Sequence, residues 1–251
     1  MGAEVSKSTV TTATEALPLA LQPVLVVLTV PNAKPLEGDL EQVYNNATAT
    51  ELTNYARALD RMTYPPGPRQ YDRRAVQAAL LLRAAIIQHY PRARVVIIAM
   101  TEQWRQHCMR QQRTHCTLET RVREMMPGLL DMYTGRRLHI ELHSFPTKGL
   151  AGDVLAANDR RGCYVVSNSG TEVSTTSLRG YVVEKKGSAA NVLLSMFPRE
   201  YRIPSVLIDF YEDKGACVIA DMAADMNSFA HWIMLEFNIM HVYAPPSSKT
   251  N

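Results

Sequence analysis

Short runs of branched apolar residues recur along the chain and alternate with longer segments of helical periodicity. The first run covers residues 23–30 and is ended by Pro31-Asn32. A continuous apolar run of this length is typical of a strand buried on both faces. Further strands are predicted at 95–99 and 138–142, and near 164–166, 181–183 and 205–210.

The segments between these runs favour helices. Residues 39–62 place apolar side chains at helical spacing, with a break near Asn45-Asn46. Asp72 is a suitable N-cap for a second helix that reaches about Tyr90, where Pro91 ends it. Further helices are predicted within 101–133, near 188–197 and over 221–240.

This alternation predicts a single α/β domain over residues 17–251, preceded by a flexible tail at 1–16. The central sheet is expected to be mostly parallel or mixed, with helices on both faces. Ligands of such open sheets bind beyond the carboxyl ends of the strands. Residues that follow strand ends are therefore the ones to examine for function.

Composition agrees with an ordinary globular protein. Apolar residues make up 46% of the chain, and 27 basic against 24 acidic side chains give a net charge of +3. That balance, without a dense basic stripe, argues against nucleic acid as a partner. The apolar stretch that ends at Val30 is too short and too interrupted to cross a bilayer.

The four cysteines, at positions 108, 116, 163 and 217, have no CxxC pair and no regular spacing. They indicate neither a zinc knuckle nor a disulfide framework, and they favour a reducing, cytoplasmic setting. His107, Cys108, His115 and Cys116 are close in sequence, but on a helix they would point to different faces. A metal site is therefore not expected there.

The N-terminus matches one targeting pattern. Gly2 follows Met1, and Ser6 stands where N-myristoylation requires a small hydroxyl residue. A single myristoyl chain would make the protein a lipoprotein that binds a membrane surface weakly and reversibly.

The predicted strand at 138–142 leads into the most unusual pattern in the chain. His139, Glu141 and His143 alternate and so share one face. Imidazole and carboxylate groups are zinc ligands, and carboxylates also orient such ligands. A hydrogen-bonded polar strand is the alternative interpretation. Ser144 does not complete a catalytic triad, because adjacent strand residues point to opposite faces.

Three segments together resemble the N-formylglutamate amidohydrolases, relatives of the zinc carboxypeptidases. Residues 26–33 (VVLTVPNA) resemble a buried strand that ends in Pro-His, and Glu141-Leu142-His143-Ser144 resembles an Asp-x-His-Ser segment. Residues 203–210 (IPSVLIDF) resemble a late strand that delivers a catalytic Glu. The order agrees with the family, and the match spans most of residues 20–215. The resemblance implies a zinc-carboxypeptidase-like, phosphorylase/hydrolase-like fold.

The resemblance also implies site residues. His143 would bind zinc, Glu37 or Asp39 would supply a second ligand, and Asp209 would be the base of a metal-assisted hydrolysis. Asn32 stands where the family has its first zinc-binding His, and an amide is a poor zinc ligand. Asp209 is one methylene shorter than the expected Glu, which disturbs general-base geometry.

The pocket implied by the resemblance includes four further residues. Glu141 and Ser144 flank the histidine ligand, while Arg110 and Arg113 are the candidates for the family's arginine-containing substrate motif. The two arginines are equally consistent with a solvated helix face.

We therefore expect a degenerate amidohydrolase, a pseudoenzyme that keeps the fold while its zinc site is impaired and its hydrolysis weak or absent. An active zinc hydrolase with an altered ligand set is a second hypothesis. A third is a structural or adaptor protein held at a membrane or capsid through acylated Gly2. The resemblance extends to proteins of large DNA viruses, which is consistent with a viral protein.

Overall fold

Strands and helices alternate in the computed structural model as the hydrophobic pattern predicts. The structure describes residues 23–31, 33, 40–61, 73–113, 116–145, 164–168, 182–184, 192–211 and 219–243; the expected tail at 1–16 and the expected cap Asp72 lie outside these ranges. The elements are β1 (Val24–Val30), α1 (Leu40–Asn46), α2 (Ala49–Asp60), α3 (Arg73–His89), β2 (Ala93–Ala99), α4 (Glu102–Arg110), α5 (Leu118–Met132), β3 (Arg136–Phe145), β4 (Tyr164–Asn168), β5 (Val182–Glu184), α7 (Val192–Met196), the π-helical turn η3 (Phe197–Tyr201), β6 (Ser205–Tyr211) and α8 (Ile219–Tyr243).

The described strands form one sheet in the order β2-β1-β3-β6-β4-β5. The first four strands in this order run parallel to one another. β4 runs antiparallel to β6, and β5 is parallel to β4. The sheet is therefore mixed, with a parallel half that contains the three most apolar strands. Parallel strands require helical crossovers, which is why helices separate these strands in the sequence.

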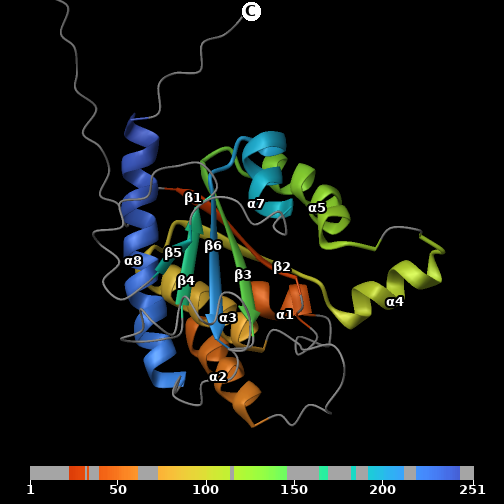
Figure 1. Cartoon of the computed structure of the whole chain (residues 1–251), viewed down its shortest axis with the longest axis horizontal. Helices are drawn as coiled ribbons and strands as arrows, with labels where there is room; N and C mark the ends of the chain where they lie inside the picture. The colour runs from red at the N-terminus through yellow and green to blue at the C-terminus, as the bar shows by residue number, and fades with distance from the viewer. Residues whose placement is uncertain are drawn as a thin grey trace, which may run out of the picture.

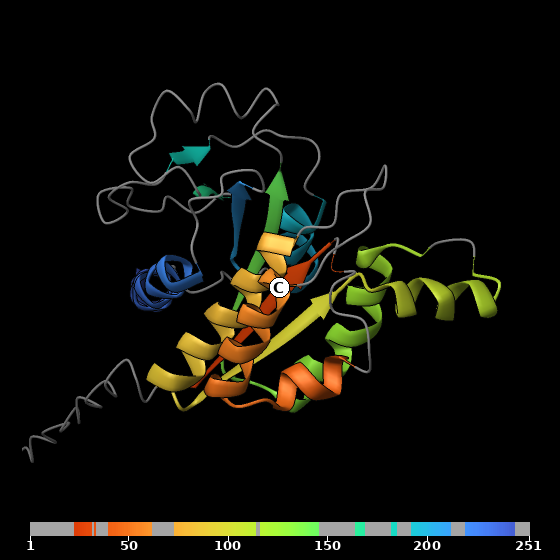
Figure 2. The same ribbon diagram turned by 90° about the horizontal axis from the view of Figure 1, so that it is seen from below.

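Helices cover both faces of the parallel half (Figures 1 and 2). On β1, Val24, Val26 and Leu28 belong to the hydrophobic cluster that includes residues of α3 and α8. The alternate residues Leu25 and Val27 belong to a second cluster, with residues of α5 and α7. Both faces of β1 are thus buried, as its uninterrupted apolar run predicts.

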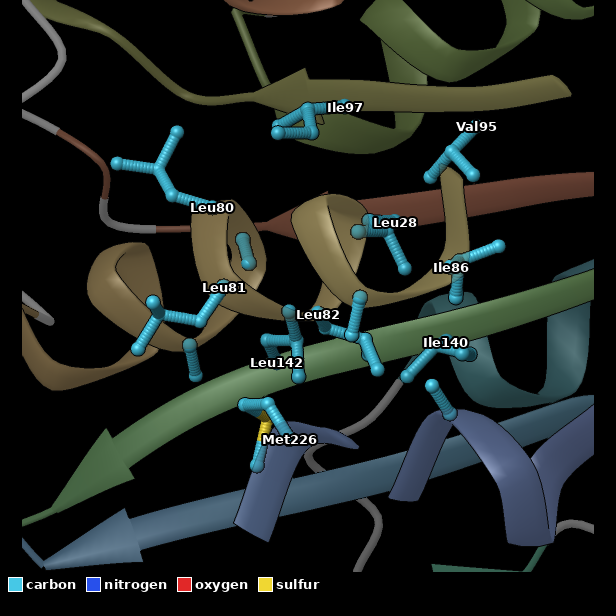
Figure 3. Close-up of a cluster of buried hydrophobic side chains, with 14 of the residues drawn as sticks. Leu28, Leu80, Leu81, Leu82, Ile86, Val95, Ile97, Ile140, Leu142 and Met226 are labelled. Atoms are coloured by element: carbon cyan, nitrogen blue, oxygen red, sulfur yellow. The ribbon is translucent and has the colours of Figure 1, made fainter. Parts of the chain in front are cut away.

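Figure 3 shows the larger of the two clusters. Leu28 of β1 and Ile140 and Leu142 of β3 meet Leu82 of α3 and Met226 of α8. All five side chains are at most a few per cent exposed, so each contributes roughly 1.5–3 kcal/mol through burial.

α3 is enclosed on nearly all sides, because every residue from Arg74 to Ile86 is buried. Its polar side chains therefore need internal partners. Gln77 donates to the Ala56 carbonyl oxygen at 3.1 Å and to Asp60 at 2.9 Å. Arg74 donates to the same Asp60 carboxylate at 3.0 Å. These bonds tie α3 to α2 across its polar side.

The predicted break near Asn45-Asn46 is confirmed, since α1 ends at Asn46 and α2 begins at Ala49. Thr48 caps α2 with a capping box: its Oγ1 accepts the Glu51 N–H at 3.3 Å, and Glu51 Oε2 accepts the Thr48 N–H at 2.8 Å. Each end of this local pair satisfies a backbone donor that the helix leaves unpaired.

The outer edge of β2 is covered by α1. Asn45 Oδ1 accepts the Ile97 N–H at 2.8 Å, and Asn45 Nδ2 donates to the Ile97 carbonyl oxygen at 3.3 Å. The buried Arg83 guanidinium donates to the carbonyl oxygens of Asn45, Ala47 and Val95. Burial, assisted by Arg94, lowers the pKa of Arg83 to about 10, so the side chain remains a cation at neutral pH.

Two expectations are corrected. The strand predicted at 138–142 extends from Arg136 to Phe145, so His143 and Ser144 lie inside β3 and not after it. The helix predicted near 188–197 changes type at its end, because α7 ends at Met196 and gives way to the π-helical turn η3, which contains Pro198; residues 188–191 lie outside the described part of the chain. Within the described part of the chain, no helix has both the length and the apolar character that a bilayer span requires.

Candidate functional site

The three segments that carry the resemblance lie on neighbouring parallel strands. β3 is paired with β1 on one side and with β6 on the other. In the register, Glu141 is opposite Thr29, and His143 is opposite Asp209. Since parallel strands end at one edge of a sheet, the end of each segment reaches the same edge. This is the edge at which open α/β sheets bind ligands.

β3 presents two chemically different faces. Leu138, Ile140 and Leu142 point into the cluster with α3 and α8. His139 stacks against Phe197 of the opposite cluster, and His143 contacts Glu141. The alternation that placed the two histidines and the glutamate on one face is therefore present in the structure.

His139 is fully buried, and both of its ring nitrogens meet hydroxyl groups. Nε2 lies 2.8 Å from Thr29 Oγ1 on β1, and Nδ1 is hydrogen-bonded to Ser205 Oγ on β6. The ring is parallel to Phe197, with 3.6 Å between centroids. Burial, and secondarily the nearby His143, holds the pKa of His139 well below its ordinary value. His139 is thus a neutral structural side chain that joins three strands.

Glu141 and His143 form a carboxylate–imidazole pair at the end of this face. His143 Nε2 lies 2.8 Å from Glu141 Oε1. The glutamate side chain is only 3% exposed, whereas that of His143 is 24% exposed. A buried carboxylate that contacts one ring nitrogen fixes the orientation of the ring. Of the two side chains, that of His143 is therefore the one that solvent or a ligand can reach.

The second oxygen of Glu141 is the unusual atom of the pair. Glu141 Oε2 is buried and has no hydrogen-bond partner among the residues that the structure describes. Burying a carboxylate oxygen without a donor costs about 1–3 kcal/mol or more, and such atoms require an explanation such as an ion or a ligand group. His143, by contrast, takes part in further interactions besides its contact with Glu141.

The metal-ligand set is incomplete in the described part of the chain, which contains no group of three or more His, Cys, Asp or Glu side chains placed to hold a metal ion. Asn32, Glu37 and Asp39, which the resemblance implicates, lie outside that part. The described chain resumes after Asn32 at Ala33, whose N–H donates to the Met100 carbonyl oxygen at 3.2 Å.

The backbones of Ser144 and Asp209 are placed, while their side chains lie outside the described residues. Ser144 is opposite Phe210 in the register, and Asp209 is opposite His143. The structure therefore puts the proposed base on the strand beside the proposed ligand.

The two candidate substrate arginines lie elsewhere. α4 extends away from the sheet in both views (Figures 1 and 2), and Arg110 is its exposed last residue. Arg113 forms an ion pair with Glu124 of α5, and its guanidinium carbon is 5.8 Å from the centre of the Trp104 ring. The contacts of Arg113 thus join α4 to α5 and do not involve His143.

Sequence reasoning missed the partners of His139. Thr29 is the one hydroxyl residue within the apolar run of β1, and Ser205 opens the run of β6. A hydroxyl inside an otherwise apolar strand signals a buried hydrogen bond. The sequence does not reveal that both bonds converge on one histidine.

No protein-family model, curated protein or solved structure matches the chain.

Proposed function

We propose that this protein is a divergent relative of the N-formylglutamate amidohydrolases, with a degenerate hydrolytic site at the shared edge of β1, β3 and β6. The observation that carries the proposal is the Glu141–His143 pair, in which one buried carboxylate oxygen has no hydrogen-bond partner among the described residues. The adjacency of the three resembling segments in the parallel half supports it. As part of the same proposal, the fold is related to that of the zinc carboxypeptidases.

The donor set fits an intact zinc site only in part. His143 and Glu141 are suitable in type, since zinc accepts imidazole and carboxylate ligands. A catalytic zinc ordinarily has three protein ligands, and Asn32 contributes an amide where the family has an imidazole. We therefore propose weak metal binding and weak or absent hydrolysis, and derive no catalytic step through a metal.

The chain's own groups still support a defined chemistry. The buried Glu141 carboxylate holds the His143 ring in one orientation. The partly exposed ring then lies at the edge where ligands of such sheets bind.

A zinc titration tests the proposal. Purified protein, a His143→Ala variant and a His107→Ala variant are compared by calorimetry; His107 is an exposed histidine on α4 and serves as the matched control. We expect weak, saturable binding that His143→Ala abolishes and His107→Ala preserves. Binding that is unchanged by His143→Ala, or absent from the unmodified protein, would contradict the proposal. Tight stoichiometric binding with amide hydrolysis would indicate an intact enzyme instead.

The N-terminal residues motivate a second proposal, that of a membrane- or capsid-associated adaptor. It depends on Gly2 and Ser6, which match the acylation pattern and lie outside the described residues. The two proposals are compatible, because an impaired hydrolase fold can serve as a scaffold.

A further inference from the structure

Arginines gather at the edge of the sheet opposite to the candidate site. In the register of the parallel strands, Arg136 of β3 is opposite Val24 of β1, and both Arg137 of β3 and Arg94 of β2 are opposite Leu25. These positions are the amino ends of the three strands, and a fourth arginine directly precedes β2. We call this group the basic edge: Arg92, Arg94, Arg136 and Arg137.

The basic edge is accessible and carries a net positive charge. Arg92 and Arg94 are exposed, and the two members on β3 are partly exposed. Arg137 donates to the Tyr133 carbonyl oxygen at 3.0 Å, and a guanidinium bound to a neutral carbonyl group keeps its charge. Asp131, exposed in the last turn of α5, is the nearest carboxylate before β3 along the chain, and it offsets at most one of the four charges.

The segment that carries the acylation pattern enters the fold at this same edge. β1 begins at Val24, between the amino ends of β2 and β3, and Pro23 directly before it is exposed. Residues 3–22 therefore connect Gly2 to the basic edge. Whatever their conformation, these residues can span no more than roughly 70 Å. A membrane that holds an acylated Gly2 is thus within reach of the basic edge.

We propose that the basic edge is the surface with which this protein binds an anionic lipid membrane of the phosphatidylserine type. Because this role rests on the adaptor proposal, it deepens that proposal by naming the side of the domain that faces the lipid. Stable attachment through one acyl chain requires a second contact, and a basic patch is a sufficient one. Arginine suits the task, since its guanidinium pairs with phosphate and carboxylate groups of lipid headgroups.

The size of the patch favours lipid over nucleic acid. Four arginines at the ends of two strands do not form the extended basic stripe that binding to a phosphate backbone requires. A charged lipid surface attracts each basic side chain within about 8 Å at physiological ionic strength, and each one contributes separately. A small basic patch beside an acyl chain is therefore sufficient for membrane binding.

This orientation leaves the candidate site open. Glu141 and His143 lie toward the carboxyl end of β3, whereas Arg136 and Arg137 lie at its amino end. A domain that binds the membrane through the basic edge turns the carboxyl ends of its parallel strands away from the lipid. Ligands that bind at those ends then approach from the solvent.

Vesicle sedimentation tests the basic edge without the acyl group. Every protein in the test carries Gly2→Ala, so the outcome does not depend on acylation. Phosphatidylcholine vesicles with and without phosphatidylserine are compared, for the parent and for an Arg92→Gln/Arg94→Gln variant. We expect binding that requires phosphatidylserine and is lost at high salt. It should fall about fivefold for each arginine removed, or roughly 25-fold for the pair.

An Arg57→Gln/Arg61→Gln variant is the matched control, since it loses the same charge at exposed positions. Both positions are near the end of α2, which Asp60 ties to Gln77 near the start of α3. α3 ends at His89, beside the amino end of β2, so the control arginines are remote from the basic edge. The control should bind vesicles as the parent does.

Three results would overturn the proposal. They are equal losses in the two double variants, binding that does not require phosphatidylserine, and binding to duplex DNA that exceeds binding to vesicles at the same salt concentration. A failure of myristoylation in cells is a separate outcome. It would contradict the acylation of Gly2 and leave the vesicle result of the unacylated protein unchanged.

Discussion

The imidazole of His139 lies flat against the phenyl ring of Phe197, with 3.6 Å between the ring centroids and 5° between the ring planes. Thr29 and Ser205 hydrogen-bond the two nitrogens of the same ring. The side chain is thus fully enclosed by protein. A ring in such a place is stable only when it carries no charge.

Acid should destabilise the protein through this histidine. The pKa of His139 is far below its ordinary value in the folded state, and about 6.5 in the unfolded chain. Below that pH the unfolded chain binds a proton that the folded protein does not, so the free energy of unfolding falls by up to about 1.4 kcal/mol per pH unit. Above about pH 6.5 this contribution is fully present and constant.

Urea unfolding from pH 7.5 to 5.0 measures the effect. His139→Gln removes the titrating group, so its stability should fall less steeply with acid than that of the unmodified protein. His107→Gln, at an exposed position, should keep the original slope. Identical slopes for all three proteins would mean that His139 takes up a proton in the folded state.

Replacing Glu141 by Gln should weaken metal binding. The amide keeps the size of the side chain but removes the charge that faces His143 Nε2 at 2.8 Å. Loss of a carboxylate that orients a histidine ligand costs about 10- to 100-fold in metal affinity. Zinc calorimetry checks the change, with Glu124→Gln on α5 as the control. An unaltered affinity in Glu141→Gln would show that the carboxylate does not act on the histidine.

Supplying the imidazole that the proposed kinship implies should strengthen metal binding. An Asn32→His change supplies the imidazole that the resemblance implies, and zinc affinity should rise by roughly tenfold or more, which corresponds to about 1.4 kcal/mol. The same change in a His143→Ala background should give no such gain, because the second imidazole is then missing. Equal gains in both backgrounds would place position 32 outside the site.

Asn45 should be important for stability although it is not part of the candidate site. Its side chain pairs with both backbone groups of Ile97 at the edge of β2. Asn45→Ala leaves those groups without their partner, at a cost of about 1–3 kcal/mol. Urea denaturation should reveal this loss, while the neighbouring exposed Asn46, changed to Ala, should have little effect. Comparable losses in both variants would contradict the edge role.

Gly2 should accept a myristoyl group in a eukaryotic cell. The expected readout is a mass increase of one myristoyl group on a peptide that begins at Gly2, and a Gly2→Ala variant should lack it. Membrane recovery should be partial, because one acyl chain binds weakly. A peptide that retains an unmodified Met1 would dismiss the adaptor proposal.

Local pattern is sufficient to predict most elements of the sheet. Continuous apolar runs identify β1 and β2, and the Asn45-Asn46 pair locates the break between α1 and α2. The residues that indicate each of these features lie within a few positions of one another in the sequence. The antiparallel direction of β4 is beyond such reasoning, because strand direction depends on how the whole chain returns to the sheet.

The candidate site, like the fold, is predictable from local sequence only in part. The period-two alternation of His139, Glu141 and His143 predicts a shared face, but not the different roles of the two histidines. Those roles depend on Thr29, Phe197 and Ser205, which are distant in sequence.

α3 has a consequence for how this protein meets other molecules. A helix whose residues from Arg74 to Ile86 are all buried belongs to the interior as fully as a central strand does. α2 and α8 pack against α3 and separate it from binding partners. Its polar side chains form hydrogen bonds with Asp60 and with backbone carbonyl oxygens. A binding partner must therefore contact the outer helices or the edge of the sheet. Those surfaces can change in sequence without disturbing the packing around α3, whereas α3 itself cannot.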